Sequence, residues 1–390
     1  MSAPAGEIRF ELAGERHDAG EGGIRALLRE TAMEGDIALS LQREPSYFAA
    51  ARQEGGEHRA IVAVDSSGRV ICAGGISIRQ RFYNGALCRV GYLGQLRLAR
   101  SHAGRFDILR RGYASFHDLH PSLDLEACFT AIATDNIRAR RLLERGISGL
   151  PRYDLAGELV TLLIPTRSVA RASRPCPRIN NTGETPVLQD FPSIQNGIDD
   201  LAAVWALLRR NAAEFQFAPS WDEPELSRLL STGGLRKDSF RILSNSTGPV
   251  AYAALWDQRP FKQAVVAHYS RRLSLLRPFY NLFAAFTGRV PLPPPHQTIA
   301  QAFVSPLAVP LDRPQWLIQL LLLLTASART LGMTAMTLAL DARDPRLPSL
   351  LQRFRPHLYR TRLYTVSWPD EPPRVEPPDG RLLYPEVALL

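Results

Sequence analysis

The 390-residue chain is poor in cysteine, and its four cysteines form no Cys-x-x-Cys pair. No histidine cluster lies beside them, so the ligand spacing of a zinc site is missing and we expect no metal. Cys72, Cys88 and Cys128 fall in predicted strands, where a reduced, buried thiol is expected; the fourth is Cys176. A chain of this length can bury its cores without disulfides or metals.

Lysine is almost missing as well, since Lys237 and Lys262 are the only two. The net charge of +9 and the pI of about 9.7 therefore come from arginine. Unlike lysine, the arginine guanidinium can bind a phosphate group with two N–H groups at once, so this charge suits a phosphorylated small ligand. Basic runs interleaved with aromatics are absent from the sequence, and we rank nucleic-acid binding below a phosphate-bearing ligand.

Long apolar runs are also missing. The most apolar stretch, Trp316 to Leu324, is far shorter than the roughly 20 residues of a membrane span. The first residues have no basic segment followed by an apolar core, as a signal peptide would. We therefore expect a cytoplasmic protein with no membrane partner.

The chain reads as two halves with the same order of elements, helix–helix–hairpin–strand–helix–strand–helix–strand. Predicted elements of the first half are helices over 24–32, 45–53, 106–119 and 136–146, and strands over 59–64, 70–78, 90–98, 125–133 and 153–164. Those of the second half are helices over 201–213, 221–230, 314–331 and 345–354, an irregular or helical segment over 273–287, and strands over 240–243, 250–256, 263–269, 298–309, 334–340 and 359–368. Residues 1–22 are expected to be loose.

Between the halves the composition changes to proline, arginine, serine and Asn-Asn-Thr-Gly, with Pro165, Pro175 and Pro177 among the prolines. We therefore predict an α/β protein of two tandem domains. The expected boundaries are 1–165, a linker or crossover over 166–197, and 198–390, and the second domain would be a copy of the first.

The stretch from Val90 to Arg145 carries the functional signal. A strand over 90–98 leads through the loop 99–105 into a helix that starts at about Phe106. Arg100 and Arg105 flank a helix start whose backbone N–H groups have no partner within the helix. Such a start is a physical site for a phosphate group.

Two motifs within this order of elements resemble the GNAT acyltransferase superfamily. The segment Leu93-Gly-Gln-Leu-Arg-Leu, followed by Ala103-Gly-Arg, stands where the family has a Q/R-x-x-G-x-G/A loop after its fourth strand. The segment Asn136-x-x-Ala-x-x-Leu-Leu-Glu-Arg-Gly146 is similar to the family's N-x-x-A-x-x-L-Y-E-K-x-G-F helix. Together the two motifs lie within a region from about Gly23 to Ile164.

The resemblance implies a mixed-sheet α/β fold that binds acetyl-CoA or another acyl-CoA as co-substrate. Main-chain groups of Leu96 and Leu98 would pair with the pantetheine arm, and Asn136 would contact its end. N–H groups of Ala103, Gly104, Arg105 and Phe106 would hold the pyrophosphate, with added charge from Arg100 and Arg105. Departures from the family pattern are Ala103 for the first loop arginine, Phe106 for the second glycine, Ile108 for the third small residue and Leu143 for the tyrosine that often serves as general acid.

The implied reaction is direct attack of an amine on the thioester, the acceptor being a small molecule or a peptide. The amine must lose a proton, and the thioester oxygen needs an N–H donor, for which Leu98 is the positional candidate. Catalytic candidates are Glu126, Tyr92 and Tyr153, the last as a replacement for the missing acid. The competing interpretation treats Glu126 as a solvated strand residue, Tyr92 as a core aromatic and Asn136 as an ordinary helix cap.

The second half has lost the phosphate loop, because Pro310 and Pro314 remove backbone donors after its corresponding strand. We interpret this half as a degenerate copy that stabilises the first or shapes the acceptor cleft. The segment from Trp256 to Tyr269, with Arg277 to Asn281, is either an acceptor-binding insertion or an ordinary surface loop. The prediction is an N-acetyltransferase, and the alternative is a non-catalytic sensor or scaffold that binds acyl-CoA.

Overall fold

The computed structural model describes residues 8–14, 18–167 and 192–390. Most of the predicted linker over 166–197, with Cys176, lies outside these residues. The strands of the first half are β1 Arg9–Ala13, β2 Ile37–Gln42, β3 Glu57–Val64, β4 Val70–Tyr83, β5 Ala86–Leu98, β6 Ala127–Ala133 and β7 Arg152–Pro165. Its α-helices are α1 Asp18–Glu30, α2 Tyr47–Glu54, α3 Phe106–Leu119 and α4 Ile137–Leu143, with 3-10 turns η1 Arg100–His102 and η2 His120–Leu123.

The second half repeats this order with additions. Its strands are β8 Ser193–Asn196, β9 Ala218–Pro219, β10 Phe240–Asn245, β11 Gly248–Trp256, β12 Gln263–Tyr269, β13 Gln301–Ala308, β14 Ala335–Asp341 and β15 His357–Ser367. Its helices are α5 Leu201–Ala212, α6 Glu223–Thr232, α7 Arg271–Thr287, α8 Pro314–Thr330 and α9 Leu347–Phe354, with 3-10 turns η3 Lys237–Ser239 and η4 Val387–Leu389.

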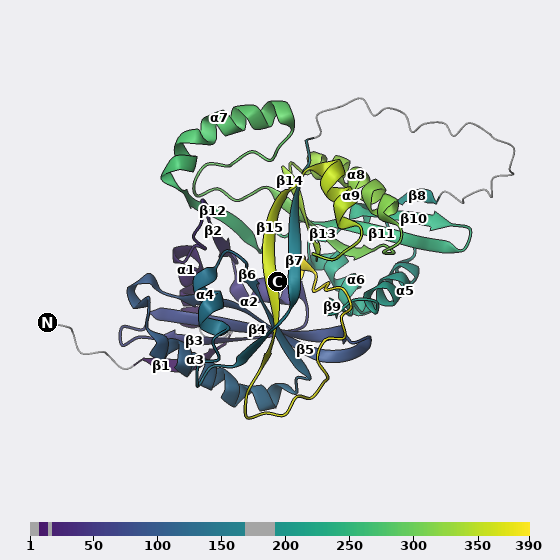
Figure 1. Cartoon of the computed structure of the whole chain (residues 1–390). Coiled ribbons are helices and arrows are strands. Elements are labelled where there is room, and N and C mark those ends of the chain that lie inside the picture. The colour runs from purple at the N-terminus through teal and green to yellow at the C-terminus, as the bar shows by residue number, and fades with distance from the viewer. Residues whose placement is uncertain (1–7, 15–17, 168–191) are drawn as a thin grey trace, which may run out of the picture.

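One mixed sheet runs through both halves (Figure 1). Its strand order is β1-β3-β4-β5-β6-β15-β7-β14-β13-β11-β10-β8. The last strand of the chain, β15, lies between β6 and β7 of the first half, and β7 in turn pairs antiparallel with β14 of the second. The predicted domain boundaries therefore divide a single continuous sheet. The final strand of each half, β7 or β15, pairs with strands of the other half.

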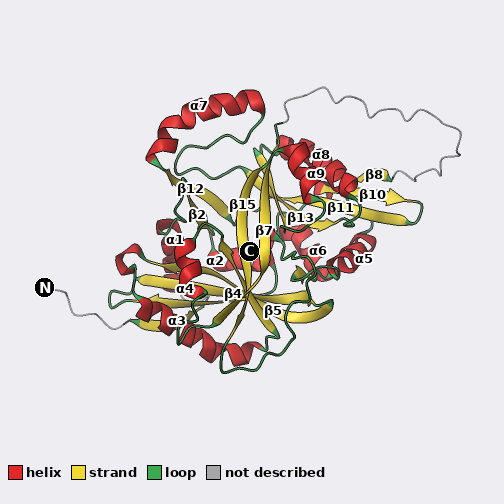
Figure 2. Cartoon of the chain, in the orientation of Figure 1, coloured by secondary structure: helices red, strands yellow, loops and turns green. Residues whose placement is uncertain are grey.

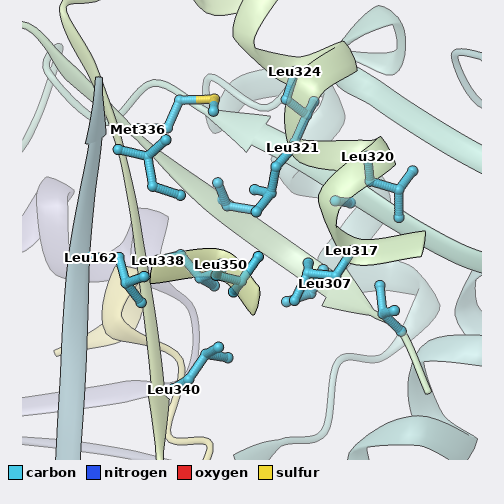
Figure 3. Packing of buried hydrophobic residues seen from close by; sticks show 14 of the residues in the cluster. Leu162, Leu307, Leu317, Leu320, Leu321, Leu324, Met336, Leu338, Leu340 and Leu350 are labelled. Atoms are coloured by element: carbon cyan, nitrogen blue, oxygen red, sulfur yellow. The ribbon is translucent and has the colours of Figure 1, made fainter. Parts of the chain in front are cut away.

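A second contact between the halves is a two-stranded sheet in which β12 pairs antiparallel with β2. Helices lie on both faces of the large sheet (Figure 2). The leucine-rich helix α8 packs on β10 and β11, and its Leu317, Leu320, Leu321 and Leu324 are fully buried (Figure 3). Each such leucine contributes about 1.5 to 3 kcal/mol of burial free energy, which explains a helix that is apolar nearly all round.

Most predicted elements are confirmed, including the extents of α3 and β12. Residues 9–13, expected to be loose, form β1 at the edge of the sheet, and the sequence pattern does not predict β2 at all. The spacing of Phe106, Leu109, Tyr113 and Phe116 predicts one apolar face of the helix, but the side chain of Phe106 is 59 % exposed. The thiols of Cys72, Cys88 and Cys128 are reduced and buried, as expected, and burial raises the pKa of each to between about 11 and about 12. In the described part of the chain no helix is long and apolar enough to cross a membrane, and no metal-ligand cluster is present.

Candidate active site

The parallel strands β5 and β6 pair over only four residues each. Val90 to Leu93 face Ala127 to Thr130, and the Thr130 hydroxyl donates to the Leu93 carbonyl at 2.7 Å at the last pair. Beyond that pair β5 continues to Leu98 and β6 to Ala133 without pairing to each other. Five more residues of β5 correspond to a gap edge about 17 Å long. The two strands therefore form a V whose narrow end lies at Leu93 and whose open end lies at Leu98.

A β-bulge lies just past the narrow end. The register of β4 against β5 shifts between Ala73 and Gly75, and Gln95 has a φ of 59°. After the bulge, the Ala99 amide donates to the Ile71 carbonyl at 2.7 Å. Because successive residues of a strand turn their amides to opposite sides, the main-chain groups of Leu98 point away from β4 and into the gap. Leu96, two residues earlier, is exposed, and its carbonyl accepts from the Arg97 guanidinium at 2.9 Å.

The loop after Leu98 folds into a 3-10 turn that occupies most of its own amides. Ala103 N–H donates to Arg100, Arg105 N–H to His102 and Phe106 N–H to Gly104, at 3.0 to 3.2 Å. Gly104 has a φ of 88°, a conformation that glycine adopts without strain. Of the four expected pyrophosphate donors, three thus bond within the loop, and a bound anion would require this turn to rearrange.

The two cations of the loop are also engaged. Arg105 forms a bidentate ion pair with Asp107, with both N–O distances at 2.7 Å, and Arg100 forms an ion pair with Glu34. The Arg105 hydrogen bonds hold the pKa of Asp107 at about 2, so this carboxylate is ionised in the first turn of α3. A carboxylate at a helix start takes the place that an incoming phosphate would take.

At the other edge of the gap, β6 leads into α4. Asn136 is the N-cap of α4, and its side chain accepts from the Ala139 amide at 3.2 Å. Leu143, in the position of the family's tyrosine, is buried. The Thr134 hydroxyl at the end of β6 is buried and has no hydrogen-bond partner among the described residues. This orphaned hydroxyl is a donor and acceptor beside the gap.

The three predicted catalytic residues lie in three different places. Tyr92 lies at the narrow end, where its ring packs on Phe129 with centroids 5.1 Å apart, and burial raises the pKa of its hydroxyl to about 12. Tyr153 is buried in the core beneath α3 and α4, with its hydroxyl 2.5 Å from that of Tyr113, and burial raises its pKa well above 10. Glu126 lies just before the first residue of the closed β5–β6 pairing, where its carboxylate accepts from the Arg89 amide at 2.6 Å.

A buried polar network, not predicted from the sequence, lies beside the narrow end. Its residues, which we call the Glu54 network, are Arg43, Tyr47, Glu54, His58, Gln95 and Lys262. Glu54 pairs with Arg43 at 2.8 Å and with Lys262 of the second half at 2.9 Å. With its amide oriented to satisfy both neighbours, Gln95 donates to the Tyr47 hydroxyl at 2.6 Å and accepts from Arg43 Nε at 3.0 Å. Hydrogen bonds from its side chain to Tyr47 and Arg43 thus hold Gln95 in place at the bulge.

Histidine and tyrosine complete this network. The Tyr47 hydroxyl lies 2.9 Å from His58 Nε2, and His58 Nδ1 lies 3.0 Å from the Ser77 hydroxyl. Burial, reinforced by Arg43, lowers the pKa of His58 to about 3, so the imidazole is neutral near pH 7. Burial also raises the pKa of Tyr47, which keeps its proton.

Burial alone would raise the pKa of Glu54, but Arg43 and Lys262 hold it below its ordinary value. The sequence held one signal for this network, because Lys262 is one of only two lysines and lies in the segment singled out as an insertion. That segment also lines a pocket whose walls include Leu41, Gln258, Gln263 and Phe303.

The second half has a similar separation of strands, but the chain itself bridges it. The parallel strands β13 and β14 pair only from Gln301 to Phe303, although β13 continues to Ala308. The Ser305 hydroxyl of β13 donates to Glu386, and the Leu383 amide donates to Asp341 at the end of β14 at 2.8 Å. Leu383, Glu386 and Leu389 are all buried, so the C-terminal segment contacts both strands of this second V.

Known proteins match this chain in structure and not in sequence. No protein-family model and no curated protein sequence matches the chain. Saccharomyces cerevisiae N-myristoyltransferase with bound myristoyl-CoA is similar in structure, with a TM-score of 0.57, 9 % identity, and coverage of 96 % of this chain and 84 % of that one. Another structure of that enzyme gives a TM-score of 0.56 at 10 % identity, covering 92 % and 82 %.

A fungal glucosamine N-acetyltransferase region, part of a multi-domain GH3 β-N-acetylglucosaminidase, is also similar. Its TM-score is 0.54 at 12 % identity, and the match covers 93 % of this chain and 38 % of that one. At identities this low, the structural similarity establishes the arrangement of the backbone alone. The chain therefore has the fold of the GNAT superfamily of N-acyltransferases.

Proposed function

We propose that the first half binds an acyl-CoA in the β5–β6 gap and transfers its acyl group to the amine of a small molecule or peptide. The observation that carries the proposal is the limited pairing of β5 with β6, which ends at Leu93 and Thr130 while α3 starts beyond the open end. A thioester tail can enter such a gap only if the strands are apart. The likeness to an enzyme whose structures hold myristoyl-CoA supports the same ligand class.

The residues around the gap fit an acyl-CoA. Leu98 offers main-chain groups to the pantetheine arm, and Leu96 would do so once its carbonyl exchanges the Arg97 guanidinium for the ligand. The buried Thr134 hydroxyl beside Asn136 offers a further partner. Gly104, Ala103, Arg105 and Phe106 would hold the pyrophosphate once the turn rearranges. Arg100 and Arg105 would then exchange Glu34 and Asp107 for phosphate oxygens, to which arginine binds with both nitrogens.

The narrow end favours a short acyl group, most simply acetyl. Phe129 is fully buried there, stacked on Phe217 with centroids 4.8 Å apart and packed against Tyr92. These rings close the gap below Leu93. A long acyl chain would have to displace them, so acetyl-CoA is expected to be used far better than myristoyl-CoA.

The reacting carbonyl would lie near the bulge rather than at Leu98. Leu98 is at the open end, about 17 Å from Leu93, and so suits the pantetheine arm. Main-chain N–H groups at the bulge, held by the Gln95 contacts to Tyr47 and Arg43, would then polarise the thioester oxygen. Tyr92, which keeps its proton, is the proposed acid: as the C–N bond forms and the C–S bond breaks, it protonates the departing thiolate and recovers the proton that the amine loses.

Two of the predicted catalytic residues stay outside this proposed set. Glu126 lies at the closed end of the strand pair, away from the gap. Tyr153 lies beneath α3 and α4 and is paired with Tyr113. Their contacts in the structure support structural roles instead.

A non-catalytic acyl-CoA sensor is the second candidate. The engaged loop amides and the Asp107 carboxylate at the start of α3 favour it, because both oppose tight binding of the pyrophosphate. Sensor and enzyme differ in whether bound acetyl-CoA is consumed.

The test compares two glycine variants. Gly104 and Gly68 have φ values of +88° and +82°, and a methyl group added to either Cα would meet no atom within 4 Å. Gly104→Ala and Gly68→Ala therefore carry a similar backbone cost of about 1 kcal/mol. Gly104→Ala is expected to weaken acetyl-CoA binding about tenfold by calorimetry, whereas Gly68→Ala leaves it unchanged.

Thiol release over a panel of amines then separates the two candidates. Tyr92→Phe should lower kcat while acetyl-CoA binding is kept. Binding without release on any amine would favour the sensor, and no binding by the wild-type protein would overturn both.

A further inference from the structure

The helix α7 presents its apolar side chains to solvent. Leu275, Phe279 and Phe286 are 77 %, 71 % and 74 % exposed. The other large apolar residues exposed on this helix are Leu276, Leu282 and Phe283. They recur three and four residues apart, so they form one continuous stripe along the helix. Monomeric soluble proteins rarely expose so many large apolar groups together, which marks the stripe as a contact surface.

The inward face of the same helix is polar. Asn281 exchanges two hydrogen bonds with the main chain of Leu292, at 2.8 and 2.9 Å. The Tyr280 hydroxyl lies 2.9 Å from His357 Nε2 of β15, and Ala284 is buried. The outward direction of the stripe is therefore fixed by specific contacts and is not an accident of a loose helix.

The charge around the stripe has one sign. Residues 271–289 contain Arg271, Arg272, Arg277 and Arg289 and no acidic residue. Arg271 and Arg272 are exposed at the start of the helix and form no ion pair among the described residues, while Arg289 follows its end. An apolar stripe with arginines at both ends matches an interfacial helix that lies on anionic lipid.

A second copy of the chain fits the stripe less well. Two copies meeting through α7 would bring these arginines together with no carboxylate on either helix to neutralise them. An anionic bilayer supplies both the apolar interior and the negative surface.

The helix also stands at an extremity of the molecule, above β12 and β2 (Figures 1 and 2). It follows β12, whose His268 contacts Glu34 at 3.0 Å, and Glu34 also pairs with Arg100 of the loop at the open end of the β5–β6 gap. Docking through α7 would therefore bring that open end close to the lipid surface.

We propose that α7 is a membrane-docking helix that binds the surface of anionic bilayers through its Leu and Phe stripe and its flanking arginines. It binds in the interfacial plane, so the proposal needs no membrane-spanning segment, and it replaces the sequence-based expectation of no membrane partner, which rested on the lack of such a segment. It also holds whether or not the protein transfers acyl groups.

The experiment is flotation of the full chain with vesicles of phosphatidylcholine alone or mixed equally with phosphatidylglycerol. Wild-type protein is expected to float with the mixed vesicles and not with the neutral ones, and to be released by high salt. The triple variant Phe279→Ser, Phe283→Ser, Phe286→Ser should lose at least tenfold in bound fraction. The double variant Arg271→Gln, Arg272→Gln should bind more weakly and with less dependence on salt.

A matched control replaces exposed leucines elsewhere, Leu12→Ser, Leu155→Ser and Leu322→Ser, and should float as wild type does. Phe279→Trp adds a reporter to the five native tryptophans, and with mixed vesicles the emission of this variant should shift further to the blue than that of wild type. The proposal is overturned if wild-type protein does not float with anionic vesicles, or if the control loses as much binding as the α7 triple variant. A dimer in solution that the α7 variant dissolves, without flotation, would assign the stripe to a second copy instead.

Discussion

Glu54 is the residue whose loss should cost this protein the most. It is 4 % exposed and neutralises two cations, Arg43 of the same half at 2.8 Å and Lys262 of the other at 2.9 Å. Glu54→Gln would leave both cations buried without a counter-charge. Removing one partner of a buried ion pair costs about 3 to 5 kcal/mol, which is a large part of the roughly 5 to 15 kcal/mol that holds a typical protein folded.

Urea unfolding at pH 7, followed by circular dichroism, measures this loss. Glu30→Gln is the matched control, because Glu30 also pairs with an arginine, Arg69 at 2.6 Å, but both side chains are half exposed. That variant should change the free energy of unfolding by no more than about 0.5 kcal/mol. Adding Arg43→Met to Glu54→Gln should recover part of the loss, since it removes one of the uncompensated cations.

The pH dependence supplies a second check. The pKa of Glu54 is held below its ordinary value of 4.5, so its contribution is complete above about pH 4.5 and is lost as the pH falls through the lower folded-state pKa. The difference between wild type and Glu54→Gln should therefore shrink below pH 4.5. A loss under about 1 kcal/mol at pH 7, or one equal to that of Glu30→Gln, would refute the assignment of Glu54 as the central ion of the network.

Two further predictions concern the loop and the histidine. Asp107→Asn frees Arg105 and removes a negative charge from the start of α3, so calorimetry should show CoA binding about two- to fivefold tighter. The control is Asp238→Asn, which breaks a similar pair between Asp238 and Arg236 and should leave CoA binding unchanged. Equal effects from both variants would contradict a phosphate site at this loop. Burial lowers the pKa of His58 from 6.5 to about 3 in the folded protein. Below pH 6.5 this histidine is therefore protonated in the unfolded chain but not in the folded one, and the free energy of unfolding falls as the pH falls. Wild type should lose about 1 to 2 kcal/mol more than His58→Gln between pH 7 and pH 5, a difference that His268→Gln, at a half-exposed position, should not produce.

The sequence alone determined the local elements and the class of fold. The patterns that predict the helices over 106–119 and 136–146 and the strands over 59–64 and 70–78 each act within a few residues. They therefore predict α3, α4 and the β3–β4 hairpin without knowledge of the rest of the chain. The two motifs around Leu98 and Asn136 indicated the superfamily for the same reason, since each is a short run that shapes one loop or one helix.

Tertiary structure alone decided how the halves are joined and which polar groups meet. The insertion of β15 between β6 and β7 depends on pairing between strands about 200 residues apart, and no local pattern specifies such a partner. Glu54 and Lys262 likewise meet only because the halves pack together, and burial then gives their charges an energy that the sequence does not reveal. Phe106 turned to solvent, and Glu126 placed at the closed end of its strand pair, show the same limit: the direction and depth of a side chain are set by neighbours that are distant along the chain.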